Sequence, residues 1–504
     1  MKKSLSILIP SILLGGLLGC YEDKGNYDYK DINEISFTLT AKDNKGRVLP
    51  VGENGICRYK QPSSNDTLIV TYIPEVSQSL RGDDTTNLEW KWKVAYNKNK
   101  EEVTDSIYSK ELTLVFPPAQ STSYNVIFQL TDLTTNVSHY KRLSVNTVQP
   151  YRNSWFVLNG TEGDRYISTI EDPDSTQYLF TKDAYADLGR PRRFQDATGF
   201  IYAPSLLGRE ATLQILAKDS IWMMRPSELK VIASNEQLLP SEIYENNVSL
   251  LYGRNGTSNS INTLLLASNN RIYKCWEGNR YESYINNDDP YYKIGMVGEF
   301  NEDGSMLAWD GNNNRVLIAT SYNELIPYPD ERTFSNKIPV WIGASTSPEK
   351  EAVGMMLMKD DNGIYYIYDF VSSDKFKEYM LPELEADENS QFAANPALTN
   401  LNGQIFYTLD SKLFRLNIKS GETTELYDAE GPISILKFRV NHPHSLADKH
   451  DCNCLAMVVN NGNNGELHEV VLTNGGDIET AKTKVFKDFG NIADICFSFI
   501  ENLK

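Results

Sequence analysis

The sequence predicts an all-β protein in which an N-terminal β-sandwich of immunoglobulin size precedes a β-propeller, and two patterns indicate this. Between residues 35 and 148, short runs with apolar residues at alternate positions are separated by turn-forming residues, without a helical period. Between residues 152 and 504, a strand, a tight polar turn and a second strand recur seven times, roughly every 50 residues. The first pattern is typical of a sandwich, and the second of four-stranded propeller blades.

The chain begins with the features of a lipoprotein signal at residues 1–19. Lys2 and Lys3 precede a short apolar core that ends in Leu17-Leu18-Gly19-Cys20. Because so short a core before a cleavage motif is a poor transmembrane helix, we expect the mature chain to begin at a diacylated Cys20 and to be held by lipid alone. An ordinary signal peptide is the alternative. Residues 20–34 are polar and predict a tether.

The net charge restricts the classes of partner that the chain can bind, and the number of cysteines restricts the disulfides that it can form. The formal net charge of -18 disfavours nucleic acid and anionic lipid headgroups as partners. Six cysteines are present, and lipidation of Cys20 would leave an odd number, so at most two intrachain disulfides can form. The sequence leaves open which of the others pair: Cys57, Cys275, Cys452, Cys454 and Cys496.

The sandwich is predicted over residues 35–148. Strand patterns begin at Ile35, Leu68, Leu88, Leu112, Tyr124 and Tyr140. Trp90 and Trp92 fall on the same face of one strand, where core packing is the expected role. The alternation of apolar and polar residues from Tyr124 to Leu130, after this Trp-bearing strand, resembles a PKD-type module.

The propeller is predicted over residues 152–504 from its repeated hairpins. These begin at Trp155, Leu213, Leu264, Met306, Met355, Gln404 and Leu455. Turns such as Asp310-Gly311 and Asn362-Gly363 supply residues that tolerate positive φ in hairpin loops. The spacing leaves room for two further strands between consecutive hairpins and so indicates seven blades. Six or eight blades, or a pair of large sandwiches, are the alternatives.

The two ends of the repeat predict how the ring closes. The first hairpin follows the sandwich after only a short linker, so its blade lacks a strand, whereas the last hairpin is followed by two strand-like runs. We therefore expect residues 492–500 to pair beside Trp155-Phe156-Val157-Leu158 as the innermost strand of the first blade. Such pairing removes an exposed sheet edge.

No known catalytic motif is evident, so no catalytic residue and no cofactor are predicted. One segment concentrates potential metal ligands: His442, His444, His450, Cys452 and Cys454. Their spacing matches no standard zinc pattern, and a polar loop with one disulfide is the preferred interpretation. Acidic turns at residues 43–46, 301–304 and 360–363 resemble calcium loops but lack a full ligand set, so turn formation explains them better.

A set of aromatic residues in the connections between hairpins is the candidate ligand-binding surface. Exposed Tyr and Trp can stack on sugar rings or pack against peptide side chains with little loss of entropy. For each residue the alternative role is to cover the edge of a blade. The set consists of Trp276, Tyr281, Tyr284, Tyr291, Tyr292, Tyr322, Tyr328 and Trp341.

The start of the mature chain, from Cys20-Tyr21-Glu22-Asp23-Lys24-Gly25 to Tyr29, resembles the PKD-like family of Bacteroidetes surface lipoproteins. The resemblance implies that Glu22 and Asp23 form an export signal, and that the protein faces the cell exterior from the outer membrane. It also implies an accessory component, associated with a SusC/SusD-type transporter and other surface lipoproteins, that binds a nutrient, either peptide or glycan. No catalytic residue accompanies this family.

Two other function classes stay open. A cell-surface propeller hydrolase or lyase would act on the same nutrient, since propellers also support catalysis in a central pocket. A purely structural subunit of the transporter complex would neither bind nor cleave it. A lipid anchor, a spacer sandwich and a large propeller that carries aromatic residues need nothing more to capture a nutrient, so the sequence favours a binding protein over an enzyme.

Overall fold

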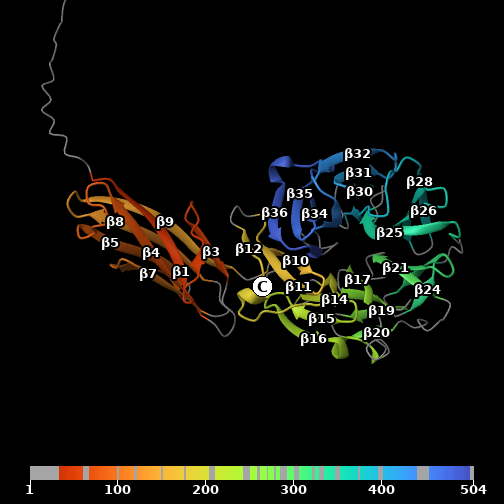
Figure 1. Ribbon diagram of the computed structural model, residues 1–504, viewed down its shortest axis with the longest axis horizontal. Helices are drawn as coiled ribbons and strands as arrows, with labels where there is room; N and C mark the ends of the chain where they lie inside the picture. Colours follow the sequence, from red (N-terminus) through yellow and green to blue (C-terminus); the bar gives the residue numbers. More distant parts are fainter. Residues whose placement is uncertain are drawn as a thin grey trace, which may run out of the picture. The chain divides into compact units, whose positions relative to one another are not determined.

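The structure is a computed structural model that describes residues 33–499 with several internal gaps. The gaps are residues 61–66, 99–100, 118–121, 149–150, 152, 175–177, 204–210, 242–249, 258–261, 269–270, 277–279, 284–291, 300–305, 321–323, 329–333, 347–351, 373–374, 396–400 and 440–452. Contacts divide the chain into two compact units, residues 1–147 and 148–504 (Figure 1). The predicted signal, Cys20, Glu22 and Asp23 lie outside the described residues.

The first unit is a sandwich of two antiparallel sheets, as predicted. One sheet has the order β2 (Val48–Leu49), β1 (Ile35–Asp43), β4 (Leu68–Gln78) and β7 (Leu112–Phe116). The other has the order β3 (Ile56–Lys60), β9 (Val137–Val148), β8 (Ser123–Asp132), β5 (Leu88–Lys98) and β6 (Glu101–Ile107). Trp92 is fully buried and its ring centroid lies 4.4 Å from that of Phe128, while Trp90 packs against the same core. Alternation along each strand thus places one face in the core.

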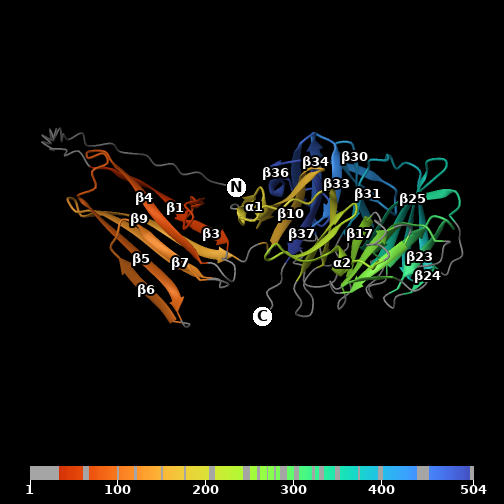
Figure 2. The ribbon, with the colours of Figure 1, turned by 60° about the horizontal axis from the view of Figure 1, so that its bottom comes forward.

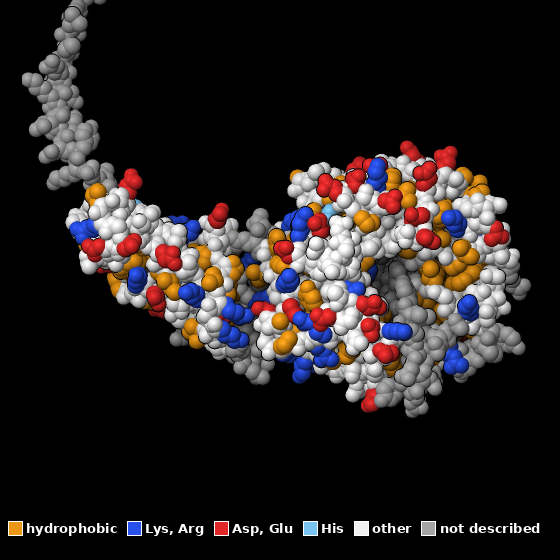
Figure 3. All heavy atoms as spheres, in the orientation of Figure 1, with side chains coloured by type: hydrophobic (Ala, Val, Ile, Leu, Met, Phe, Trp, Pro, Cys, Tyr) orange, Lys and Arg blue, Asp and Glu red, His pale blue; other side chains and the backbone are white. Residues whose placement is uncertain are grey.

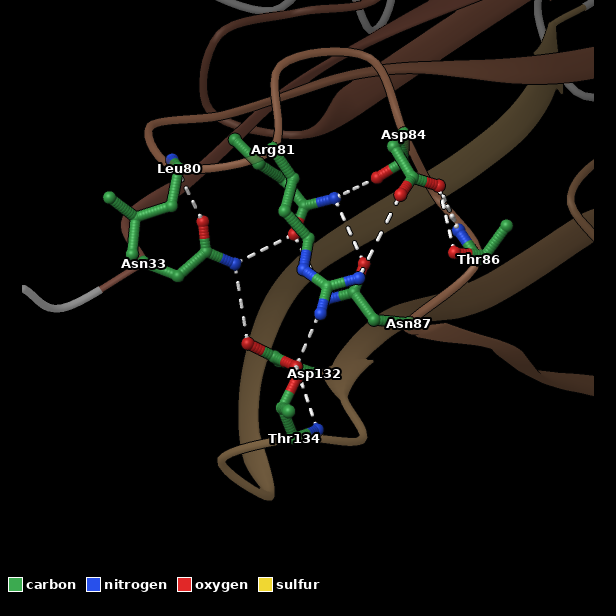
Figure 4. A network of polar contacts seen from close by, with 9 residues as sticks. Asn33, Leu80, Arg81, Asp84, Thr86, Asn87, Asp132 and Thr134 are labelled. Carbon is green, nitrogen blue, oxygen red and sulfur yellow. Dashed lines mark hydrogen bonds and ion pairs between the residues drawn. The ribbon is translucent and has the colours of Figure 1, made fainter.

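A polar network closes one end of the sandwich (Figure 4). The buried carboxylate of Asp132 accepts hydrogen bonds from Asn87 Nδ2 at 3.0 Å and from the Thr134 backbone N–H at 2.8 Å. Asn87 and the buried Gln78 exchange two amide hydrogen bonds of 3.1 Å. Asn33 donates to both Gln78 and Asp132 and so fixes the start of the described chain to this end. Buried polar groups are tolerated here because each has partners.

The second unit is a propeller of seven four-stranded sheets within the described residues. Blade 1 contains β37 (Ile492–Phe499), β10 (Asn153–Thr161), β11 (Asp164–Glu171) and β12 (Leu179–Thr181); blade 2, β13 (Ala197–Ala203), β14 (Thr212–Ala217), β15 (Ile221–Arg225) and β16 (Lys230–Ser234); blade 3, β17 (Leu250–Thr257), β18 (Asn262–Ser268), β19 (Arg271–Trp276) and β20 (Tyr281–Ser283); blade 4, β21 (Ile294–Glu299), β22 (Met306–Asp310), β23 (Arg315–Ala319) and β24 (Leu325–Pro327).

Blade 5 contains β25 (Lys337–Thr346), β26 (Ala352–Asp360), β27 (Tyr365–Ser372) and β28 (Lys375–Leu381); blade 6, β29 (Phe392–Ala394), β30 (Gln404–Leu409), β31 (Lys412–Asn417) and β32 (Thr423–Asp428); blade 7, β33 (Ile433–Phe438), β34 (Cys454–Asn461), β35 (Asn464–Val471) and β36 (Lys484–Phe489). Short helices α1 (Ala184–Asp187) and α2 (Asn235–Leu238) and the 3-10 helix Thr480–Lys482 lie in connections. The predicted hairpins are the two central strands of every blade, which confirms seven blades.

The predicted ring closure is confirmed. β37 pairs antiparallel with β10, and Trp155 lies opposite Phe497 (Figure 2). β37 takes the sheet edge that the first strand occupies in the other blades, and it contacts β13, which in turn contacts β17. The last strand of the chain therefore completes blade 1 at the centre of the ring.

We call the contact between blades 7 and 1 the seam, and its inner part holds a buried carboxylate. Asp494 of β37 forms an ion pair with Lys437 of β33 in blade 7. Its second oxygen accepts a hydrogen bond of 2.8 Å from the backbone N–H of Phe200 in blade 2. Asp494 is only 8% exposed. Through these two contacts, its side chain connects the closing strand of blade 1 with blades 7 and 2.

Candidate functional site

The candidate ligand site is a hollow of about 370 Å³ on blade 2. It is lined by Trp222 from β15, Ser234 from the end of β16, and Asn235, Glu236 and Gln237 from α2. The register between β15 and β16 places two of the lining residues side by side, because Trp222 pairs directly with Ser234. The sequence places the helix immediately after the strand, so its polar side chains lie next to the indole.

Hydrogen bonds hold α2 in place beside the turn between β14 and β15. Asn235 Oδ1 accepts from the Ile221 backbone N–H at 2.8 Å, and Asn235 Nδ2 donates to the Asp219 carbonyl at 3.4 Å. Gln237 Oε1 accepts from the Ser234 backbone N–H at 3.0 Å, as in a capping box. These contacts position the rim of the hollow without using all of its polar groups.

The lining suits a ligand that has both an apolar face and oxygen acceptors. The Trp222 ring is half-buried and is supported by an edge-to-face contact with Phe194, with 5.3 Å between ring centroids. Among the described residues, neither the Trp222 indole N–H nor the Gln237 NH₂ has a hydrogen-bond partner. An aromatic surface beside convergent amide and hydroxyl groups is typical of sites that bind sugars or peptides. The sequence interpretation missed this site, although Trp222 stands before a turn and a polar helix start.

Two residues of the predicted aromatic set belong to the core, so the prediction that they contact ligand at the surface is wrong. Tyr281 is 1% exposed, and its hydroxyl donates to Gln214 Oε1 at 2.7 Å. Burial raises the pKa of Tyr281 well above its ordinary value. Tyr328 is buried, with its ring centroid 5.2 Å from that of Phe370. Both rings fill the space between neighbouring blades, which large side chains occupy well.

The rest of the aromatic set does not form one surface within the described residues. Tyr292 is half-buried, with the Arg315 guanidinium 5.5 Å from its ring centroid. Trp341 is half-buried against the core shared by blades 5 and 6. Trp276 ends β19 in blade 3, so these positions come from different blades. Tyr284, Tyr291 and Tyr322 lie outside the described residues.

Of the predicted metal ligands, only Cys454 is described; His442, His444, His450 and Cys452 lie outside the described residues. Cys454 is a buried free thiol among the described residues. Cys452, the other cysteine of this segment, lies outside them, so the disulfide expected for the segment stays a prediction. The Cys454 sulfur lies 3.1 Å from Glu469 Oε1, and burial raises the pKa of the thiol well above its ordinary value. Within the described part of the chain, no three His, Cys, Asp or Glu side chains are arranged to hold a metal ion.

Cys454 belongs to a polar cluster at the seam. Arg439, 3% exposed at its side chain, donates to Glu469 Oε1 at 2.8 Å and to Asp174 Oδ1 at 2.9 Å. Trp155 of blade 1 donates its indole N–H to the same Glu469 oxygen at 3.2 Å. A guanidinium in this position satisfies two carboxylates at once, so the cluster joins blade 7 to blade 1.

The acidic turns form hairpins, as expected from their composition. Asp360 Oδ1 accepts from the backbone N–H groups of Asn362 and Ile364, each at 2.9 Å. Asp43 Oδ1 accepts from the N–H groups of Lys45 and Arg47 in the same manner. These carboxylate oxygens already serve the backbone of the turn. Residues 301–304 lie outside the described residues.

Lys274 has a perturbed pKa. It lies on β19, is fully buried, and burial lowers its pKa to about 8, opposed by Glu282 on the neighbouring strand. Perturbed lysines often occur in active sites. Lys274 does not line the hollow, which is on blade 2, and its side chain has no exposed surface from which to meet a substrate.

One family model matches the N-terminal part of the chain. The sequence model of the PKD-like family matches residues 20–190, which include the sandwich and continue into blade 1. No curated protein matches the chain in sequence. In the described residues, no helix has the length and apolar character needed to span a membrane.

Several solved structures match parts of the chain at low sequence identity. A quinonprotein alcohol dehydrogenase-like protein from Bacteroides thetaiotaomicron has a TM-score of 0.43 and 13% identity, covering 91% of this chain and 99% of its own. A putative 6-phosphogluconolactonase from Bacteroides fragilis has a TM-score of 0.39 and 12% identity, with coverages of 69% and 99%. Virginiamycin B lyase from Staphylococcus aureus has a TM-score of 0.36 and 14% identity, with coverages of 56% and 84%. The chain is thus an all-β protein with a PKD-like sandwich followed by a seven-bladed β-propeller.

Proposed function

We propose that this protein is a lipid-anchored outer-membrane protein, exposed at the cell surface, that binds a peptide or glycan nutrient as an accessory component of a SusC/SusD-type uptake system. The observation that carries the binding role is the hollow on blade 2, where the Trp222 ring lies beside the neutral polar groups of Ser234, Asn235 and Gln237. These groups can hold hydroxyl-rich or amide-rich ligands by stacking and hydrogen bonding. The lipobox ending at Cys20 and the acidic residues after it support the location.

Ligand binding is tested with the mature chain and pools of oligosaccharides and peptides, measured by calorimetry and by product analysis. Trp222→Ala removes the stacking surface and should weaken binding at least tenfold. Gln237→Ala should weaken binding several-fold without changing the melting temperature, because this side chain is exposed. Ile232→Ala, an exposed position on β16 outside the hollow, is the matched control.

The outcomes of this experiment separate the three function classes. Binding that depends on Trp222 and Gln237 and leaves the ligand intact supports the accessory role. Cleaved products would instead indicate a hydrolase or lyase. Absence of binding from every pool would favour a structural subunit, and unchanged affinity in both variants would show that the hollow is not the site.

The location is tested separately from binding. Cys20→Ala should release the protein from the membrane fraction, because no lipid can then be attached. Replacement of Glu22 and Asp23 should leave the protein lipidated but protected from protease added to intact cells. Protease digestion equal to that of the unchanged protein would contradict the export role of these two residues.

A further inference from the structure

The outer face of the five-stranded sheet of the sandwich carries two exposed tyrosines at the ends of one row. Tyr140 on β9 lies opposite Gln129 on β8, which lies opposite Lys91 on β5. Tyr108 directly follows β6, and the Lys91 ammonium is 5.0 Å from its ring centroid. Tyr140 is 60% exposed and Tyr108 is 63% exposed. With neighbouring strands about 4.8 Å apart, the two rings are separated by three strand spacings, or about 14 Å.

The next row of the same face is basic. Arg142 on β9 lies opposite Ile127 on β8, and Ile127 lies opposite Lys93 on β5. Among the described residues, no carboxylate forms an ion pair with Lys91, Lys93 or Arg142. Three cations without a carboxylate ion pair among the described residues thus occupy adjacent rows of one face, in a chain whose net charge is -18.

Small hydrogen-bonding side chains complete the face. Asn125 lies opposite both Ser144 and Ala95 in the third row, and Ala95 lies opposite Thr104 of β6. Gln129 Nε2 donates to Thr131 and Ser138, which leaves its carbonyl oxygen directed to other donors. Glu89, two residues before Lys91, is the one acidic side chain on β5 at this face. We call these three rows, with Tyr108 and Tyr140, the basic tyrosine face.

We propose that the basic tyrosine face binds an acidic polysaccharide that crosses the strands, with Tyr108 and Tyr140 stacking on sugar rings and Lys91, Lys93 and Arg142 binding its carboxylate or sulfate groups. Charge complementarity selects an anionic chain, since no carboxylate among the described residues forms an ion pair with these three cations. The two rings and the row of hydroxyl and amide groups select a hydroxyl-rich polymer. This site lies in the sandwich and does not depend on the hollow on blade 2.

The proposal is tested with the mature chain on immobilised polygalacturonate, chondroitin sulfate and neutral pullulan, and on phosphatidylglycerol vesicles. We expect binding to one or both acidic polymers, which distinguishes carboxylate from sulfate, and no binding to pullulan. The affinity should fall as sodium chloride is raised, because charged contacts are screened.

Matched substitutions locate the site. The double change Lys91→Gln and Lys93→Gln should weaken binding at least tenfold. Lys42→Gln with Lys45→Gln, exposed positions on β1 of the other sheet and in the turn after it, should change binding less than twofold. Tyr108→Ala with Tyr140→Ala should also weaken binding at least tenfold, whereas Tyr178→Ala, an exposed tyrosine of the propeller, should not.

Three results would overturn the proposal. These are absence of binding to both acidic polymers, equal losses in the control variants, and binding to the vesicles in place of the polymers, which would make the face a membrane contact. Trp222→Ala should leave polymer binding unchanged, so failure of this proposal and failure of the nutrient site are distinguishable. Lys91 and Trp222 are half-buried and the other substituted side chains are exposed, and an unchanged melting temperature of each variant confirms that it is folded.

Discussion

The sandwich and the propeller both bury a carboxylate in a polar network, but the two networks connect very different parts of the chain. In the sandwich, Asp132 is bound by Asn33, Asn87 and Thr134, which are at most 99 residues away. At the seam, Trp155 binds Glu469 across 314 residues, and Asp494 of the closing strand binds Phe200 of blade 2 across 294 residues. The sandwich is therefore completed by its own local strands, whereas the propeller depends on the last strand of the chain.

This difference has a physical cause in the sheet edges. The sandwich ends each sheet in short or polar edge strands such as β2 and β6, which are largely exposed. In blade 1 the corresponding edge of β10 carries Trp155, Phe156 and Val157, all buried, and β37 pairs along this edge. Figure 3 shows acidic side chains over the visible face of the propeller. These side chains lie at the surface and do not cover the apolar edge of β10.

The largest expected effect follows from removal of the closing strand. Deletion of residues 491–504 should unfold or aggregate the propeller, because it exposes the apolar edge of β10 and removes Asp494 from the seam. The sandwich should stay folded, since its core contains no residue of this segment. Calorimetry with limited proteolysis followed by mass spectrometry measures each unit separately.

A truncation that removes only residues 501–504 is the control and should melt like the full chain. A protein lacking residues 491–504 that retained the original propeller transition would contradict the role of β37. Joint loss of both units would contradict the independence of the sandwich.

A smaller effect is expected from one side chain of the seam. Arg439→Ala leaves the buried Glu469 without its main cation and should lower the free energy of unfolding of the propeller by about 3–5 kcal/mol. Arg415→Ala breaks an ion pair with Asp477, whose side chain is 67% exposed, and should cost about 0–1 kcal/mol. Chemical denaturation of both variants measures these free energies of unfolding. Equal losses would show that the burial of the seam cluster does not increase its contribution to stability.

The smallest expected effect is confined to the sandwich. Asp132→Asn replaces an acceptor with an amide whose NH₂ faces donors, and should lower the free energy of unfolding of the sandwich by about 1–3 kcal/mol. The exposed Asp105→Asn is the control and should change it by less than about 0.5 kcal/mol. The propeller transition should not move in either variant. A shift of the propeller transition would mean that the two units are coupled.

The low pKa of Asp132 predicts that the stability of the sandwich depends on pH. Hydrogen bonds, above all from the Thr134 hydroxyl, hold the pKa of Asp132 well below its ordinary value of 3.8. The unfolded carboxyl therefore takes up a proton first as the pH falls, so the stabilisation is present above about pH 4 and is lost below it. Acid unfolding of the sandwich should be less steep in Asp132→Asn. Identical acid profiles would rule out this linkage.

The sequence by itself determined the all-β class, the seven hairpins and the closing strand. Strand alternation and turn residues such as Asp360-Asp361-Asn362-Gly363 are local signals, and they act within a few residues. The closure of Trp155 on Phe497 was predictable because counting strands left one place empty and one strand unused. These inferences needed only order along the chain.

Only the tertiary structure decided which side chains lie in the core and which meet solvent. Tyr281 is buried between blades 2 and 3, while Trp222 lines the hollow, and both occur in similar aromatic strand patterns. Cys454 contacts Glu469 because β34 pairs with β35. The cations of the basic tyrosine face lie near one another because of the register between their strands. Such contacts depend on distances between strands that are remote in sequence, and composition and spacing do not encode those distances.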